Sequence, residues 1–180
     1  MKKNLFNTIE IPEGITIKQE DDFFVVTGPA GTVSKKMNFG RLNVSIEGDK
    51  VIIGNEKSTK TEKKMMNSNT AHVQNMIKGA TEQFVYELKI CSGHFPMNVK
   101  KEGNKAIIKN FLGEKVDRSC SIPQGVEVEI NKTEILVKSP NKELAGQAAA
   151  NFEKATTIKG RDKRIFQDGI YIIKKAGKEI

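Results

Sequence analysis

The chain contains 180 residues, of which 37% are hydrophobic and 29% charged, a composition typical of a folded protein and not of a disordered one. Its 30 Lys and Arg residues exceed its 22 Asp and Glu residues by 8, so we expect a polyanionic partner. No stretch approaches the about 18 apolar residues that a transmembrane helix needs, and the basic start lacks the apolar core of a signal peptide. Two cysteines form no disulfide framework and suit a reducing cytoplasm. Membrane insertion and export are therefore not expected.

Alternating apolar residues and turn signals predict several short strands in the first third of the chain. A Gly-Pro-Ala-Gly turn at residues 28–31 separates two of them, and a Glu-Gly-Asp-Lys turn at residues 47–50 separates two more. Thr59 and Glu62 then have the spacing of a capping box that begins a helix, and Gly79 is expected to end it. The apolar spacing of this helix predicts the following buried face: Met65, Asn69, Val73, Met76 and Ile77.

The same pattern then occurs a second time. Residues 15–20 align with 97–102, residues 42–46 with 126–130, and residues 51–53 with 135–137. Gly31 falls on Gly113, so both glycines are expected at positive φ or in close backbone packing, within equivalent turns. Ser139 and Pro140 are expected to begin the second helix. Its predicted buried face consists of Leu144, Ala148, Phe152 and Ala155.

These two copies predict an α+β protein built by tandem duplication of a small domain, with one helix packed on mostly antiparallel β-sheets in each copy. The expected organisation is a first repeat in residues 1–82, a linking strand and turn in residues 83–95, and a second repeat in residues 96–180. In this interpretation Val85 and Tyr86 close the first copy as Ile170 and Tyr171 close the second.

The positive charge is concentrated in the second copy. Residues 1–82 carry 12 Lys and Arg against 10 Asp and Glu, whereas residues 83–180 carry 18 against 12. The excess of positive charge is greatest between residues 159 and 178, which contain seven basic residues and only two aspartates, and glycines interrupt the run. A grouping of this kind is often only a solvated face, but glycine and arginine together favour contact with phosphates.

Residue patterns of catalysis and of metal binding are missing from the sequence. Cys91 and His94 have the spacing of zinc ligands, but no second ligand pair accompanies them, so we expect no metal. The chain has no nucleophile-elbow, phosphate-loop or His-Glu-x-x-His motif, and we expect neither an enzyme nor a cofactor. Aromatic residues make up only 6%, which favours recognition of folded RNA by shape and phosphates over a base-stacking platform.

Several segments resemble the family of the sixth protein of the large ribosomal subunit, in its archaeal and eukaryotic branch. The similar segments are residues 28–34, 94–97, 110–115, 146–149 and 164–172. The most specific is the last, with its Phe-x-Asp-Gly-Ile-Tyr sequence, and the resemblance runs from about residue 8 to residue 175. It implies two tandem copies of one α+β unit, in agreement with the duplication.

The resemblance further implies a structural role in the ribosome. Members of the family bind large-subunit rRNA mainly through the second domain, near the sarcin–ricin loop and the stalk base where elongation factors dock, while the first domain points outward. Neighbouring large-subunit proteins are further expected partners, and a membrane or small-molecule substrate is not. The implied RNA-facing stretches, together with the basic end of the chain, give these candidate rRNA-binding residues: Asn141, Lys142, Gln147, Lys159, Gly160, Arg161, Lys163, Arg164, Lys174 and Lys175. Asp162 lies inside the expected loop and departs from the pattern of the bacterial branch.

Two other functional classes remain as alternatives. The first is a free basic protein–protein adaptor without stable RNA binding, which would fail to sediment with large subunits at physiological salt. The second is a small nuclease, against which stands the lack of an acidic metal-binding cluster in the sequence.

Overall fold

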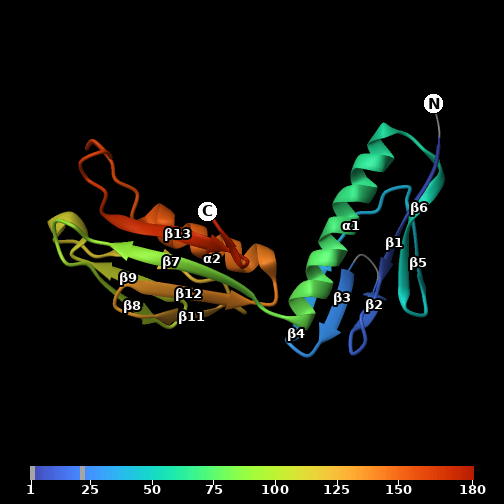
Figure 1. Cartoon of the computed structure of the whole chain (residues 1–180), viewed down its shortest axis with the longest axis horizontal. Helices are drawn as coiled ribbons and strands as arrows, with labels where there is room; N and C mark the ends of the chain where they lie inside the picture. Colours follow the sequence, from blue (N-terminus) through green and yellow to red (C-terminus); the bar gives the residue numbers. More distant parts are fainter. Residues whose placement is uncertain (1–2, 21–22) are drawn as a thin grey trace. The chain divides into compact units, whose positions relative to one another are not determined.

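The computed structural model describes residues 3–20 and 23–180, and the chain divides into two compact units (Figure 1). Unit 1 comprises Met1–Gln83 and unit 2 comprises Phe84–Ile180. The buried apolar residues form two separate clusters, one within each unit. Within the described residues, neither helix is long and apolar enough to cross a bilayer.

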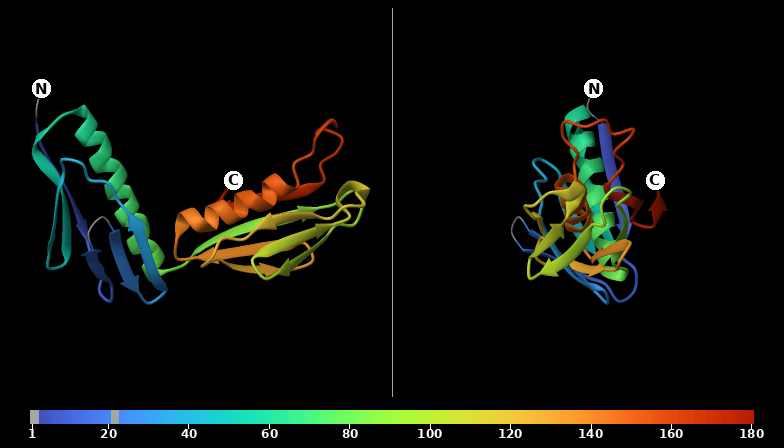
Figure 2. Two further views of the ribbon diagram at one scale, coloured as in Figure 1. Left: turned by 180° about the vertical axis from the view of Figure 1, so that it is seen from behind. Right: turned by 90° about the vertical axis from the view of Figure 1, so that its left-hand side faces the viewer.

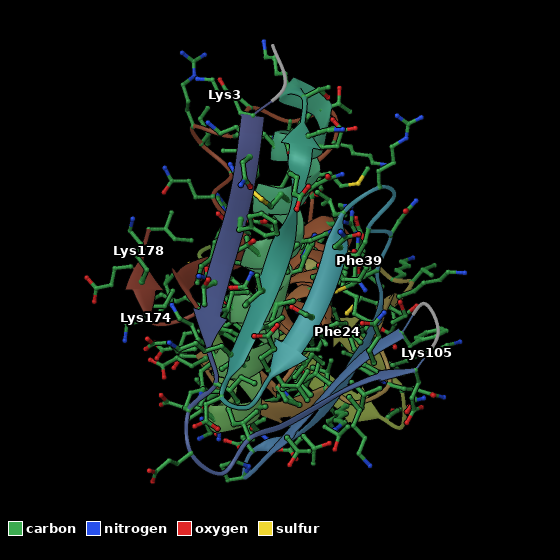
Figure 3. All side chains as sticks on the ribbon, turned by 90° about the vertical axis from the view of Figure 1, so that its right-hand side faces the viewer. Lys3, Phe24, Phe39, Lys105, Lys174 and Lys178 are labelled. Atoms are coloured by element: carbon green, nitrogen blue, oxygen red, sulfur yellow. The ribbon has the colours of Figure 1, made fainter. Side chains whose placement is uncertain are left out.

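Unit 1 contains one helix and six strands arranged in two antiparallel sheets. The elements are β1 (Lys3–Glu10), β2 (Thr16–Glu20), β3 (Phe23–Gly28), β4 (Gly31–Lys36), β5 (Asn43–Glu47), β6 (Lys50–Ser58) and α1 (Lys60–Thr81). One sheet has the strand order β2-β3-β4 and the other β1-β6-β5. Helix α1 packs on strands of both sheets, and the core between them includes Phe24, whose ring contacts that of Phe39 (Figure 3).

The predicted turns and helix start of unit 1 are confirmed, but α1 ends later than expected. Glu47 pairs with Lys50 across the β5–β6 hairpin, and the Glu62 carboxylate accepts a hydrogen bond from the backbone N–H of Thr59. Gly79 lies inside the helix, which continues to Thr81, and the Ala80 carbonyl near its end accepts a hydrogen bond from the Ala30 N–H (2.9 Å). The end of α1 is thereby attached to the turn between β3 and β4.

Unit 2 contains a larger sheet and a shorter helix. Its elements are β7 (Phe84–Cys91), β8 (Asn98–Glu102), β9 (Lys105–Lys109), the short 3-10 helix η1 (Phe111–Gly113), β10 (Arg118–Ser121), β11 (Glu127–Ile130), β12 (Glu134–Ser139), α2 (Lys142–Ala155), β13 (Gly169–Lys175) and β14 (Lys178–Glu179). The five-stranded sheet has the order β11-β12-β7-β13-β14 and the three-stranded sheet the order β10-β9-β8. All of these pairings are antiparallel.

The stretch expected to link the repeats is the central strand of unit 2. Strand β7 pairs with β12 on one side and with β13 on the other, and Leu88 at its centre is fully buried. Strand β1 pairs with β6 as β7 pairs with β12, so β1 and β7 are the equivalent opening strands of the two units. Residues 84–91 therefore neither link the units nor close the first, and only Glu82 and Gln83 connect α1 to β7.

The second helix begins two residues later than expected. Ser139 is the last residue of β12 and Pro140 precedes the helix cap, Asn141, whose side chain accepts hydrogen bonds from two first-turn N–H groups. Ala148 and Phe152 of the predicted face are fully buried, and Leu144 and Ala155 pack at the edge of the core.

Gly31 and Gly113 both have positive φ, as expected, but their turns differ in length. Gly31 closes a tight hairpin opposite Gly28, whereas Gly113 belongs to η1 in a longer connection between β9 and β10.

Candidate RNA-binding surface

The most exposed basic segment of unit 2 follows α2. Residues 159–164, which we call the basic loop, are all exposed, and they include four of the predicted cations. In Figure 2 this connection, in orange-red, lies at the same end of unit 2 as the loop between β7 and β8. The loop therefore presents Lys159, Arg161, Lys163 and Arg164 to solvent.

Asp162 gives the basic loop its local shape. Its carboxylate accepts a hydrogen bond from the Arg164 N–H (2.9 Å) and forms an ion pair with the Arg164 guanidinium (3.0 Å). Its backbone carbonyl accepts hydrogen bonds from the next turn of chain, at Ile165 and Phe166. The hydrogen bonds from the side chain and backbone of Arg164 lower the pKa of Asp162, so the residue stays ionised as a structural part of the loop.

A chain of four side chains, which we call the loop brace, holds the base of the basic loop. The Arg161 guanidinium lies over the Phe166 ring at 4.8 Å, and the His94 ring stacks on the same phenyl ring at 4.8 Å. His94 in turn contacts the buried carboxylate of Asp168, by its backbone N–H (3.0 Å) and by its ring Nδ1 (2.5 Å). Residues from the β7–β8 loop and from the end of the α2–β13 connection are thus fixed to each other.

The ionisation of Asp168 depends on this contact. Burial favours the neutral acid, but hydrogen bonds from the backbone and ring of His94 outweigh burial and place the pKa of Asp168 below its ordinary value. Asp168 is therefore ionised at neutral pH, and its negative charge interacts with His94 within unit 2.

The guanidinium of Arg118 forms hydrogen bonds within unit 2. Its Nη1 donates hydrogen bonds to the carbonyls of Ala155 (2.9 Å) and Thr157 (3.1 Å) at the end of α2. Its other nitrogens bind the Glu114 carboxylate (2.6 and 2.7 Å), and the guanidinium lies over the Phe111 ring. The hydrogen bonds from Arg118 lower the pKa of Glu114. Arg118 therefore fixes the end of α2, from which the basic loop departs.

The predicted residues at the start of α2 have structural contacts of their own. Asn141 caps the helix through hydrogen bonds of 2.9 and 3.4 Å from backbone N–H groups. The Lys142 ammonium lies over the Phe84 ring at 5.7 Å. Gln147 is exposed and donates a hydrogen bond to Asn151 (2.8 Å). With a rise of 1.5 Å per residue, these positions lie up to about 20 Å from the basic loop along the helix.

Lys174 and Lys175 lie on the hairpin that β13 and β14 form, which we call the terminal hairpin, and Lys175 is the more exposed of the two. The Lys174 ammonium forms an ion pair with Glu87 (2.9 Å), and this hydrogen bond raises the pKa of the lysine. Lys175 is exposed and pairs across the hairpin with Lys178. Lys174 and Lys178 are labelled in Figure 3. The predicted residues thus form three groups: the basic loop, the start of α2 and the terminal hairpin.

The comparison with known families decides the assignment. The sequence profile of the family described as "Ribosomal protein L6" matches the chain twice, over residues 11–83 and over residues 95–169. The chain belongs to the ribosomal protein L6 family. Two matches to one profile confirm the tandem duplication, and each begins just after an opening strand, β1 or β7.

Curated members of the L6 family from archaea are similar to the chain over nearly its whole length. The protein named large ribosomal subunit protein uL6 of Methanococcus vannielii is 44% identical over 170 residues, which cover 94% of the chain and 93% of that protein. Its namesake in Methanosarcina mazei is 42% identical over 176 residues, or 98% of the chain and 100% of that protein. The Nanoarchaeum equitans protein is 42% identical over 180 residues, covering 96% of the chain and 94% of that protein.

These relatives confirm the resemblance to the archaeal branch. As a member of a ribosomal protein family the chain is a structural protein and not an enzyme, as expected from its motifs.

Sequence reasoning missed the loop brace of this L6 family member. In the sequence His94 has the spacing of a zinc ligand relative to Cys91, but in the structure its ring contacts the Asp168 carboxylate. Among residues 3–20 and 23–180, no group of three or more His, Cys, Asp and Glu side chains is arranged to hold a metal ion. His94 and the Phe166–Asp168 segment both lie in stretches that carry the family resemblance, and this was the available signal for their pairing.

Proposed function

We propose that the chain is a structural constituent of the large ribosomal subunit and binds large-subunit rRNA mainly through unit 2. The observation that carries this proposal is the basic loop, whose four cations are exposed on a segment held by the loop brace. A preorganised loop loses less conformational entropy on binding than a mobile one, so more of the electrostatic attraction remains as affinity.

The chemistry of the loop suits phosphates. The guanidinium of Arg161 offers a planar fork to phosphate oxygens, and lysines act as point charges. Gly160, with φ of +69° and open space around its α-carbon, allows the backbone to approach RNA closely. Such contacts fix the position of a protein on a folded RNA but read no bases, so we expect the basic loop itself to recognise the shape of the RNA.

The three groups of predicted residues are separated along unit 2. The start of α2, with Asn141, Lys142 and Gln147, lies at the opposite end of the helix from the basic loop, and Lys174 and Lys175 lie on the terminal hairpin. We propose that the three groups contact different parts of one folded rRNA region. Asn141 would then both cap α2 and contact the RNA.

A finer location follows from the family resemblance. We propose that unit 2 lies near the sarcin–ricin loop and the stalk base, that unit 1 points outward toward neighbouring ribosomal proteins, and that elongation factors dock nearby. Hydroxyl-radical cleavage from probes attached at residue 163 of assembled subunits should cut the sarcin–ricin region. Cuts confined to distant rRNA would refute this location.

The RNA-binding role is tested by titrating the full chain with a large-subunit rRNA fragment at several salt concentrations. Replacing Lys159 and Arg161 by Gln should weaken binding and make the salt dependence shallower, by about 0.7–0.9 in log–log slope for each lost phosphate contact. The matched control replaces Lys101 and Lys132, which are exposed elsewhere on unit 2, and should leave both quantities nearly unchanged. Equal effects of the two double variants would refute the assignment to the basic loop.

The free-adaptor alternative makes a different prediction. An adaptor without stable RNA binding would remain in the supernatant when large subunits are sedimented at physiological salt. The proposed constituent sediments with them and is released only at high salt.

A further inference from the structure

A hollow of about 320 Å³ lies beside the basic loop, between the end of α2 and β13. Its wall is formed by the last turn of α2 and the residues just after it, by Lys163 of the basic loop and by Tyr171 of β13. Of the predicted rRNA-binding residues, Lys163 lines this hollow.

Tyr171 is placed in the hollow by a glycine. Tyr171 is 41% exposed, and a Cβ atom on Gly169 would lie 3.2 Å from two atoms of its ring and from its hydroxyl oxygen. Gly169 also has a φ of +156°, so a side chain there would meet both strain and crowding. The backbone of β13 thus leaves room for the Tyr171 ring while much of it remains accessible. Burial raises the pKa of the phenol, which is therefore neutral at physiological pH.

The rest of the wall combines apolar and charged groups. Ile158 is largely buried and supplies an apolar surface, while the Lys154 and Lys163 side chains are exposed at the rim. Glu153 also lines the hollow, which lies at the C-terminal end of helix α2. A helix C-terminus and a carboxylate both repel an anion, so the inside of the hollow does not suit a phosphate.

We infer that the hollow receives one unstacked base of the bound rRNA, which stacks on Tyr171 while Lys154 and Lys163 contact the flanking phosphates. Bases splayed out of loops and bulges are commonly recognised by stacking on an aromatic side chain. A neutral base with an exocyclic amino group matches the Glu153 carboxylate, which accepts hydrogen bonds. This inference rests on the proposed rRNA binding and assigns it a specific contact.

The test compares variants of the full chain in binding to the large-subunit rRNA fragment over a range of salt concentrations. Tyr171→Leu should weaken binding about 5- to 150-fold, as expected for the loss of one base–aromatic stack, without changing the salt slope because no charge is removed. Tyr171→Phe keeps the ring and should bind like the original protein. Lys163→Gln should instead make the slope shallower by about 0.7–0.9.

A second measurement uses the unmodified protein in case Tyr171→Leu impairs folding, which thermal unfolding would reveal. Ultraviolet cross-linking followed by mass spectrometry should join Tyr171 to one nucleotide, and the same base should be protected from base-specific reagents in the complex. A folded Tyr171→Leu variant that binds within twofold of the original, or the lack of both the cross-link and the protection, overturns the inference while rRNA binding stands. If the unmodified protein does not bind the fragment at any salt concentration, the proposed function fails as well.

Discussion

The Asp168 carboxylate shows how one buried charge supports the surface above it. Because its pKa is lowered in the folded state, its ionised form stabilises unit 2 at pH values above the ordinary carboxyl value of 3.8. This contribution is lost as the pH falls through the lowered folded-state pKa. The contact is between residues 74 positions apart, so it exists only in the folded protein.

Replacing Asp168 by Asn should therefore destabilise unit 2 by about 1–3 kcal/mol at pH 7, since a charged hydrogen-bond partner of His94 is lost. The difference from the original protein should shrink as the pH falls from 3.8 through the lowered folded-state pKa of Asp168, because the original carboxylate then becomes protonated in the folded protein as well. Chemical unfolding at pH 7 and across this acidic range measures the difference. Asp117→Asn is the matched control, because Asp117 forms an exposed ion pair with Lys109 (3.3 Å) and should change stability by less than about 1 kcal/mol. Equal effects of the two substitutions would contradict the role given to Asp168.

The two cysteines should differ in reactivity. Burial raises the pKa of the Cys120 thiol to about 11, whereas the side chain of Cys91 is partly accessible. The thiolate is the reactive species, so an alkylating reagent at pH 8 should modify Cys91 much faster than Cys120 in the folded protein. Peptide mapping by mass spectrometry measures both rates, and denaturant should remove the difference. Similar rates in the folded protein would show that Cys120 is accessible.

At the scale of elements, the loop brace connects the β7–β8 loop with the α2–β13 connection, which lie far apart in the sequence. The stack of Arg161 and His94 on Phe166 restricts the basic loop, and RNA binding should depend on it. We expect Phe166→Leu to lower affinity for the rRNA fragment about 2- to 10-fold, because the cation–π contact and part of the loop order are lost. The salt slope should stay nearly constant, since Arg161 keeps its charge.

Phe95→Leu provides the control for this substitution. Phe95 lies next to His94 in the same loop and is 45% exposed, but its ring lies beside Gly113. Its replacement should leave RNA affinity nearly unchanged. If Phe95→Leu weakens binding as much as Phe166→Leu does, the effect reflects the apolar surface at this end of unit 2 and not the brace.

Much of the local structure could be predicted because residues close together in the sequence determine it. Val51 and Ile53 alternate toward the core, and Thr59 and Glu62 mark a helix start within four residues of each other. Strand β7 was misinterpreted because its partners lie about 50 and 80 residues later, and no local pattern identifies them. The repeat could not reveal it either, since the detected similarity begins only after β1 and β7.

The candidate site was predictable to a similar degree. Charge and resemblance predicted the basic loop as a candidate, because a run of cations is visible in the sequence, whereas its exposure is seen only in the structure. His94 and Asp168 were not identified, because their roles depend on a contact that only the folded chain creates.

At the scale of the whole molecule, the division at residue 83 predicts which pieces are stable. A fragment of residues 84–180 should unfold cooperatively, because it retains the complete five-stranded sheet and its core. A fragment of residues 92–180 lacks β7, which separates β12 from β13, and should not fold. Thermal unfolding followed by circular dichroism distinguishes them. A cooperative transition in the shorter fragment would show that β7 is dispensable.

The central position of β7 also sets the order in which the chain can fold while it is being synthesised. Unit 1 has all its strands and its helix once Thr81 has emerged, but β7 lacks its neighbour β13 until Lys175 has emerged. At about 5–20 residues per second, synthesis of the intervening 94 residues takes roughly 5–19 seconds. During that interval one edge of β7 has no partner within the chain, and an unpaired edge strand is a site of aggregation. The nascent protein is therefore most vulnerable to aggregation between the completion of its first unit and the arrival of β13.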